Sequence, residues 1–296
     1  NRFVIEGNAC LKRPRNWILF ALVAFMWGAG WPVMKVALSY VDPLNLALQR
    51  FVLSALTLSP LLIYAGRKIP RDRKTMTRLF LLSAVNASSM LMTYWGLVYE
   101  TSGISSILTY TQPIFVFCLC ILFLKSEATL ERLLGVLVGF SGVIVLTVGR
   151  ASSTVGLAST GDLLLILGAF LWAVVLVYYK GGLSQVDAVL TTVIQQSLGA
   201  VFVAPAALGL MGFSFPLTPS YLIVILYLSS GASGIVLCLW YYLLREEDVT
   251  VLSSSSLLIP VIAVLLGWGL LAEDVQPNTL LGMGLILTGL YLTNRS

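Results

Sequence analysis

The amino-acid sequence predicts an all-α integral membrane protein with ten transmembrane helices, arranged as two inverted five-helix repeats. Three observations lead to this fold class. The 296 residues are 58% hydrophobic and only 10% charged, whereas charged residues make up about 25% of an average soluble domain. Ten apolar runs are each long enough to cross a bilayer, which takes about 20 residues. The order of polar and special residues in the first half of the chain also recurs in the second half.

The internal repeat is carried by polar and special residues, because apolar segments match one another easily by chance. An offset of 145 residues aligns the first pairs, and a two-residue insertion changes the offset to 147. The matched pairs are Trp27 with Trp172, Lys35 with Lys180, Asp42 with Asp187, Trp95 with Trp240, Ser106 with Ser253, Pro113 with Pro260, Glu127 with Asp274, Gly135 with Gly282, and Gly142 with Gly289. Internal repeats in membrane chains are typical of transporters whose site lies between the halves.

The ten expected spans follow the apolar runs along the chain. They cover residues 17–39, 44–64, 78–98, 103–124, 132–149, 162–180, 189–211, 220–243, 250–271 and 279–294. Five crossings per half make the second copy enter the membrane from the opposite side, so the halves are inverted. We therefore predict an N-terminal repeat over residues 1–149 and a C-terminal repeat over residues 150–296, together forming one membrane domain.

Basic residues set the orientation of the chain, because Lys and Arg accumulate in cytoplasmic loops. With a cytoplasmic N-terminus, the 18 basic residues divide unequally between the two sides. The cytoplasmic ones are Arg2, Lys12, Arg13, Arg15, Arg67, Lys68, Arg71, Arg73, Lys74, Arg78, Lys125, Arg132, Lys180, Arg245 and Arg295. Lys35 and Arg150 lie outside, and Arg50 lies within a span. The sequence predicts an integral protein of a prokaryotic plasma membrane with both termini cytoplasmic. Its net charge of +5 is loop charge and indicates no nucleic-acid partner.

No catalytic or metal site is indicated. The chain has no histidine, which excludes imidazole ligands and imidazole acid–base catalysis. Its four cysteines are too scattered for a structural zinc site. The serine run at 253–256 has no lysine placed within the membrane as a base. We predict that the protein is not an enzyme and holds no cofactor or metal.

Polar and aromatic residues inside the predicted spans mark a candidate substrate cavity. Asn86, Met90, Thr93 and Leu97 follow one another at a spacing of three or four, so they share one helix face. Packing is the alternative reading for each aromatic ring, and close helix approach is the alternative for the serines. The full set of candidate substrate-binding residues is Trp27, Asn86, Thr93, Tyr110, Gln112, Trp172, Ser233, Tyr241 and Ser254.

Pro113 and Pro260 are repeat-related and lie about ten residues into the fourth and ninth spans. Proline removes an intrahelical hydrogen bond and frees a carbonyl. We expect a paired helix bend at these two positions.

Arg50 is the one charge clearly inside a predicted span, where a charge costs roughly 2.5–3.5 kcal/mol on insertion scales. It could reach the headgroups, bind helix carbonyls, or face a carboxylate or phosphate of a substrate. Glu100 ends the third span at the same outer depth. Glu100 could pair with Arg50 or Lys35, or take up a proton. Because Glu100 is the nearest charged candidate, we predict that Arg50 pairs with it and holds the second span to the outer end of the third or fourth span, so that Arg50 and Glu100 act as gating or structural charges.

The ordered motifs along the chain resemble the drug/metabolite transporter superfamily, specifically its EamA-type branch. The motifs are Trp27-Gly28, Gln49-Arg50-Phe51, Tyr94 to Tyr99, Tyr110 to Pro113, the glycines Gly135, Gly139 and Gly142, then Leu171-Trp172, Pro260, Glu273 and Gly282 to Gly289. The resemblance covers essentially the whole chain. It implies alternating access through a central cavity lined by helices 1, 3, 4, 6, 8 and 9, with Tyr110, Gln112 and Trp172 inside it. Glutamine at position 112 departs from aromatic amino-acid exporters of this type and favours a more polar substrate.

The leading hypothesis is a secondary transporter of small metabolites, amino acids or related polar solutes, with export favoured. The competing hypothesis is a non-transporting membrane scaffold or receptor whose aromatic core is only packing. The expected partners are a small-molecule substrate and the lipid bilayer. A monomer and a homodimer are both compatible with the sequence, and no coupling ion is assigned.

Overall fold

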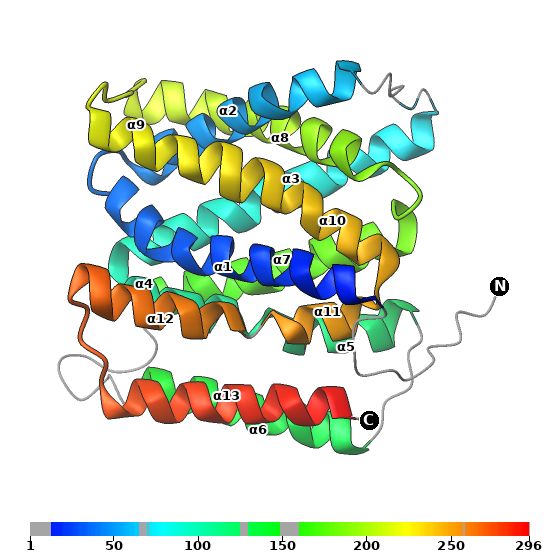
Figure 1. Ribbon diagram of the computed structural model, residues 1–296, viewed down its shortest axis with the longest axis vertical. Helices are drawn as coiled ribbons and strands as arrows, with labels where there is room; N and C mark the ends of the chain where they lie inside the picture. Colours follow the sequence, from blue (N-terminus) through cyan, green and yellow to red (C-terminus); the bar gives the residue numbers. More distant parts are fainter. Residues whose placement is uncertain are drawn as a thin grey trace.

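The computed structural model describes residues 13–64, 70, 72–124, 130–148, 160–256 and 258–295, and all regular secondary structure within them is helical. Figure 1 shows the helices packed side by side and running in roughly the same direction across the molecule. The α-helices are α1 (Pro14–Ala37), α2 (Pro43–Tyr64), α3 (Arg73–Tyr99), α4 (Ser102–Thr109), α5 (Gln112–Leu124), α6 (Leu130–Val148), α7 (Thr160–Gly182), α8 (Ala188–Ala206), α9 (Pro219–Leu226), α10 (Val236–Glu246), α11 (Val249–Ser255), α12 (Leu258–Leu271) and α13 (Pro277–Arg295). Two π-helical segments, η1 (Ala207–Met211) and η2 (Tyr227–Ile235), continue α8 and α9.

Seven segments among the described residues are long and apolar enough to cross a membrane. They are α1, α2, α3 and α7, and the continuous runs α4–α5, α8–η1 and α9–η2–α10. Shorter or broken apolar helices occupy the other three predicted ranges, namely α6, the pair α11–α12, and α13. The chain is therefore an all-helical membrane protein.

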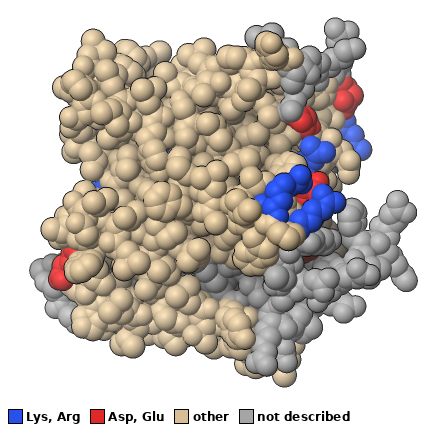
Figure 2. Space-filling view, viewed as in Figure 1, with Lys and Arg blue, Asp and Glu red and all other residues tan. Residues whose placement is uncertain are grey.

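The distribution of charge fits a membrane setting. In Figure 1, α1 begins and α13 ends at the same end of the bundle. Figure 2 shows that Lys and Arg side chains gather at this end, while the broad middle of the visible face is uncharged. Large apolar side chains such as Ile18, Phe123 and Trp268 are exposed on the surface of the bundle, as lipid contact requires. Several residues used above lie outside the described residues: Arg2, Lys12, Arg67, Lys68, Arg71, Lys125, Glu127 and Arg150.

The predicted proline bends take the form of interruptions: α4 ends at Thr109 and α5 begins at Gln112, while α11 ends at Ser255 and α12 begins at Leu258. Pro113 is the second residue of α5 and Pro260 is the third residue of α12, each at the start of a new helix. The first helical turn has no intrahelical partner for its N–H groups, so proline costs little there. Tyr110 and Thr111 form the connection between α4 and α5. Backbone polar groups at such breaks become available inside the membrane.

Aspartates at repeat-related positions start two helices in the same way. The Asp42 carboxylate accepts the backbone N–H groups of Leu44 at 2.9 Å and Asn45 at 3.0 Å at the start of α2. Asp187 accepts the N–H of Leu190 at 3.1 Å at the start of α8. Both satisfy N–H groups that the first turn of a helix leaves unpaired.

Helices α6 and α13 pack closely through glycines that the repeat pairs with each other. A Cβ atom built on Gly142 would lie 2.7 Å from the Gly282 carbonyl oxygen, and one on Gly289 would lie 2.5 Å from the Gly135 carbonyl oxygen. Small residues allow this approach between membrane helices. Each half therefore supplies one glycine that approaches the other half, and one backbone carbonyl that the other half's glycine approaches.

Two lysines at repeat-related positions also make equivalent contacts. Lys35 Nζ, in the last turn of α1, donates to the carbonyl oxygens of Leu97 and Glu100 at 2.7 Å each. Lys180 Nζ, in the last turn of α7, donates to those of Leu244 and Glu247, again at 2.7 Å. The last carbonyls of a helix have no intrahelical donor, and a cation is favourable there. Each lysine ties the end of one helix to the end of another within its own half.

Candidate functional site

A cavity of about 150 Å³ is lined by residues from both halves of the chain. Its walls come from α1, α2, α3, the α4–α5 connection, α7, α8, η2 and α10, so α2 and α8 join the helices that the resemblance implies. No described residue of the ninth range, α11–α12, lines it. The lining residues are Trp27, Gly30, Trp31, Met34, Arg50, Asn86, Ser89, Met90, Thr93, Tyr94, Thr109, Tyr110, Gln112, Trp172, Gln196, Leu228, Ala232, Ser233 and Leu237.

The cavity brings together most of the candidate substrate-binding residues. Those that line it are Trp27, Asn86, Thr93, Tyr110, Gln112, Trp172 and Ser233. Tyr241 does not line it: its hydroxyl donates to Gln195 Oε1 at 2.8 Å and its ring lies 4.4 Å from that of Tyr179. Ser254 is in α11, and its side chain lies outside the described part of the chain.

Indole rings form one wall of the cavity. The Trp27 indole donates to the carbonyl oxygen of Ala232 at 2.9 Å, and its ring meets that of Trp172 edge to face at 6.3 Å between centroids. Trp31 meets Tyr110 in the same manner at 6.4 Å. The Ala232 carbonyl belongs to η2, and such π-helical turns are frequent at functional sites. The result is a rigid aromatic wall that can contact the apolar part of a solute.

Helix α3 contributes a polar stripe that faces α7. Ser89 Oγ donates to the Gly168 carbonyl oxygen at 2.8 Å. A Cβ on Gly168 would lie 2.7 Å from Thr93 Oγ1, so only glycine allows the two helices to approach this closely. Asn86 and Thr93 are held beside the cavity by this contact.

The α4–α5 break supplies polar groups without protein partners. The Thr109 hydroxyl and the Gln112 side-chain carbonyl oxygen are buried and have no hydrogen-bond partner among the described residues. Both residues line the cavity. A buried polar atom without a partner is costly, at about 1–3 kcal/mol. These two groups therefore remain unpaired within the cavity wall.

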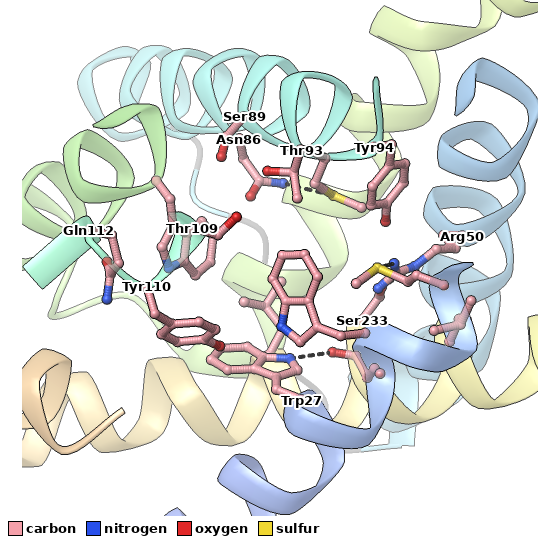
Figure 3. A pocket seen from close by; sticks show the side chains of 18 of the residues that line it. Trp27, Arg50, Asn86, Ser89, Thr93, Tyr94, Thr109, Tyr110, Gln112 and Ser233 are labelled. Carbon is pink, nitrogen blue, oxygen red and sulfur yellow. Dashed lines mark hydrogen bonds between the residues drawn. The ribbon is translucent and has the colours of Figure 1, made fainter. Parts of the chain in front are cut away.

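Arg50 lies at the opposite side of the cavity from the α4–α5 break (Figure 3). Its guanidinium donates to Ser233 Oγ from Nε at 3.0 Å and from Nη2 at 2.6 Å, and to Met34 Sδ from Nη1 at 2.9 Å. The Tyr94 ring lies 5.2 Å from the guanidinium carbon. The predicted pairing of Arg50 with Glu100 is therefore wrong.

Glu100 instead lies where the end of α3 meets the start of α7. It is buried and follows the last residue of α3, where its backbone carbonyl accepts Lys35. A Cβ on Gly161 would lie 3.1 Å from Glu100 Cγ, so the N-terminus of α7 packs directly on it. The nearby Glu273 carboxylate accepts the N–H groups of Ser102 at 2.7 Å and Gly103 at 3.0 Å. This contact joins the start of α4 to the second half.

Tyr94 and Gln196 line the cavity but are absent from the sequence-based candidates. Tyr94 lies four residues after Met90, which also lines the cavity, so its place on α3 could have been inferred from the helical face. Gln196 Nε2 donates to Ser54 Oγ at 3.0 Å and to the Ser233 carbonyl oxygen at 2.7 Å. Nothing in the spacing along α8 indicates that this glutamine faces inward.

Comparison with known proteins supports the same architecture. The EamA-like transporter family matches the chain twice, over residues 15–148 and 159–295. An uncharacterized transporter of Archaeoglobus fulgidus is 32% identical over 285 residues, with 93% of this chain and 96% of the relative covered. The Bacillus subtilis transporter YvbV is 28% identical, with 96% and 93% covered.

A relative named for its membrane and a solved structure extend this comparison. The Escherichia coli inner membrane transporter YedA is 27% identical, with 93% of this chain and 88% of the relative covered. A protein of known crystal structure superimposes with a TM-score of 0.73 at 16% identity, over 95% of this chain and 96% of the other. That likeness shows the same fold. Two family matches that together span nearly the whole chain show that this protein is a membrane transporter and belongs to the EamA-like transporter family.

Proposed function

We propose that the protein is a secondary transporter that moves small polar metabolites, amino acids or related solutes, by alternating access through the central cavity. The observation that carries this proposal is the cavity itself, because both halves contribute to its wall and its lining includes residues with unpartnered polar atoms. In secondary transporters the substrate site typically lies between the two repeats, where helices are broken. The favoured export direction follows from the resemblance to amino-acid exporters.

The proposal includes ten spans in two inverted halves, with both termini cytoplasmic. The equivalent contacts of Lys35 and Lys180 and the reciprocal glycines of α6 and α13 support an inverted pair. The gathering of Lys and Arg at the end where α1 begins supports the orientation. In this arrangement the Lys35 end faces outward and the Lys180 end faces the cytoplasm.

Contacts between the halves exist at both ends of the bundle, as alternating access needs. At the outer end, Glu273 holds the start of α4. At the cytoplasmic end, Asn16 Nδ2 donates to Glu247 Oε1 at 2.5 Å, and Arg13 forms an ion pair with Glu246 at 3.5 Å. Breaking one set while keeping the other would open the cavity to one side only.

Flux into proteoliposomes tests the proposal. Reconstituted protein should move at least one solute from a panel of radiolabelled amino acids and small organic acids, while empty liposomes should not. Gln112→Ala and Trp172→Ala should each lower that flux about tenfold or more, because both side chains face the solute. Gln112→Ala should leave the melting temperature near normal, since its buried carbonyl oxygen has no partner to lose.

Matched controls separate a role in transport from a role in packing. Gln185→Ala removes an exposed loop glutamine, and Trp268→Ala removes an exposed indole on α12; both should transport normally. If Trp172 only packs, its truncation should cost about 3–5 kcal/mol and reduce folded yield. If no solute of the panel enters proteoliposomes faster than it enters empty liposomes, the result would contradict transport and favour a scaffold or receptor.

A further inference from the structure

We propose that the cavity selects small organic acids and that Arg50 and Tyr94 bind their single carboxylate. This inference rests on the proposed function, in that the cavity is taken as the transport site. It adds the charge of the substrate and the residues that recognise it.

Arg50 gives the cavity a positive charge that no described lining residue compensates. It is the one charged residue among the described residues of the cavity lining, and its side chain is only 6% exposed. Its partners among the described residues, Ser233, Met34 and Tyr94, are all neutral. A buried charge without a counter-ion is costly, and removing it from water needs a partner of opposite sign. The missing partner is an anion.

The guanidinium also has unused hydrogen-bond donors. It carries five N–H groups, and the described residues accept three of them, one by the thioether of Met34, which is a weak acceptor. Two N–H groups remain for a ligand. Ser233 takes two donors from one side of the guanidinium and so fixes its plane. Arginine held in this way suits the planar oxygens of a carboxylate.

Tyr94 provides a second, independent indication of a ligand. Its side chain is 2% exposed, its hydroxyl oxygen lies next to the Arg50 guanidinium, and no described residue accepts the hydroxyl proton. In Figure 3 the ring lies beside Arg50, with its hydroxyl pointing toward the arginine. A phenol can donate its proton to the same carboxylate that Arg50 binds. The two unused donors then share one acceptor group.

Charge balance and size favour a small monocarboxylate over other solutes. One negative charge neutralises one guanidinium, whereas a phosphate dianion would leave excess negative charge in a site of low dielectric. A cation would meet Arg50, and no carboxylate among the described lining residues would offset that charge. The cavity measures about 150 Å³, and an apolar protein cavity of about this volume holds benzene. The body of the ligand would contact the Trp27 and Trp172 rings.

Matched probes with one body and different charge test the proposal. Three hydrocarbon groups, isobutyl, phenyl and methyl, are each tested on the purified protein as the carboxylate and as the neutral amide. The isobutyl group is also tested as the cation 3-methylbutylamine. Inorganic phosphate serves as the dianion. Binding is measured by the shift in melting temperature with ligand concentration. We expect at least one carboxylate to produce a given shift in melting temperature at about one tenth of the concentration that its amide needs. The amine and phosphate should cause no shift.

Two variants assign the recognition to named side chains. Arg50→Gln should abolish the difference between carboxylate and amide, while Arg73→Gln, an exposed arginine in the first turn of α3, should keep it. Tyr94→Phe keeps the ring and removes only a hydroxyl whose proton no described residue accepts. It should leave the melting temperature of the free protein unchanged or raised and weaken carboxylate binding about tenfold, or about 1.4 kcal/mol. A purely structural hydroxyl would instead lower the melting temperature.

The outcomes separate this proposal from the transport proposal. Equal binding of carboxylates and amides, no carboxylate binding across the series, or full selectivity in Arg50→Gln would each overturn the anion site. Protein-dependent flux of a neutral or cationic solute without carboxylate binding would overturn the anion site and leave transport standing. Arg50-dependent carboxylate binding without any flux would support the anion site and contradict transport.

Discussion

Replacing Gly289 with leucine is expected to prevent α13 from packing on α6 and to remove most of the folded protein. A Cβ atom at this position would lie 2.3 Å from the Gly139 backbone nitrogen and 2.5 Å from the Gly135 carbonyl oxygen. Backbone atoms cannot move aside as a flexible side chain can. Overpacking in a core costs about 1–3 kcal/mol, and a clash with the facing helix backbone should exceed this range. Size-exclusion chromatography and the melting temperature in detergent measure the effect.

Gly284 provides the matched control for this substitution. It lies on the exposed face of the same helix, and a Cβ there would have nothing within 4 Å. Gly284→Leu should therefore be monodisperse, with a nearly normal melting temperature. Gly142→Leu should reproduce the Gly289 defect, because its Cβ would lie 2.7 Å from the Gly282 carbonyl oxygen. Normal folding of Gly289→Leu would show that α6 and α13 do not need this close approach.

Replacing Gly30 with leucine is expected to stop transport while preserving the fold. Gly30 lines the cavity, and a Cβ there would meet nothing within 4 Å. The leucine side chain would occupy much of a cavity of about 150 Å³. Filling empty space costs no packing, and leucine is a better helix residue than glycine by roughly 0.5–1 kcal/mol. We expect flux to fall by at least tenfold, with a melting temperature that is unchanged or higher.

A leucine of the same kind on the outer surface is the control for Gly30→Leu. Gly269 lies on the exposed face of α12, and a Cβ there has nothing within 4 Å. Gly269→Leu should therefore transport at the normal rate. Undiminished flux through a well-folded Gly30→Leu protein would place the solute path somewhere other than this cavity.

Much of the fold could be predicted from the sequence because membrane helices leave strong one-dimensional signals. Apolar length indicates a span, and the repeat-related glycines and lysines indicate equivalent positions in each half. Gly142 and Gly289, or Lys35 and Lys180, indeed make equivalent contacts. Each of the seven segments long enough to cross a membrane overlaps one predicted range over most of its length, with ends that differ by a few residues.

The helix breaks and the π-helical segment could not be predicted from those signals. Proline is compatible with a bend, a break or a helix start, and the surrounding packing decides among them. Pro113 and Pro260 both lie at helix starts. The extra residue of a π-helical turn leaves no mark in hydropathy, although η2 places Ala232 and Ser233 on the cavity.

The errors at the site have a common physical cause. Sequence position gives the depth of a residue in the membrane but leaves the direction of its side chain undetermined. Arg50 and Glu100 were matched by depth, yet Arg50 turns toward Ser233 on η2. Tyr241 is both aromatic and polar, like several cavity residues, yet its ring packs on that of Tyr179. Trp27, Asn86 and Thr93 do line the cavity, and the two α3 residues could be placed together because they lie on one helix face.

Access to Thr93 from the two sides of the membrane tests the central claim most directly and needs no known substrate. A single cysteine is placed at Thr93 in protein whose Cys10, Cys118, Cys120 and Cys238 are replaced. A membrane-impermeant thiol reagent is then applied to right-side-out and inside-out vesicles. Cysteines at the exposed loop residues Ser39 and Gln185 report the orientation, and each should react from one side only, Ser39 from outside and Gln185 from the cytoplasmic side. Alternating access predicts that the Thr93 cysteine reacts from both sides. Folded protein in which it reacts from neither side, while the two loop cysteines behave as predicted, would contradict the account and identify the cavity as the closed core of a scaffold.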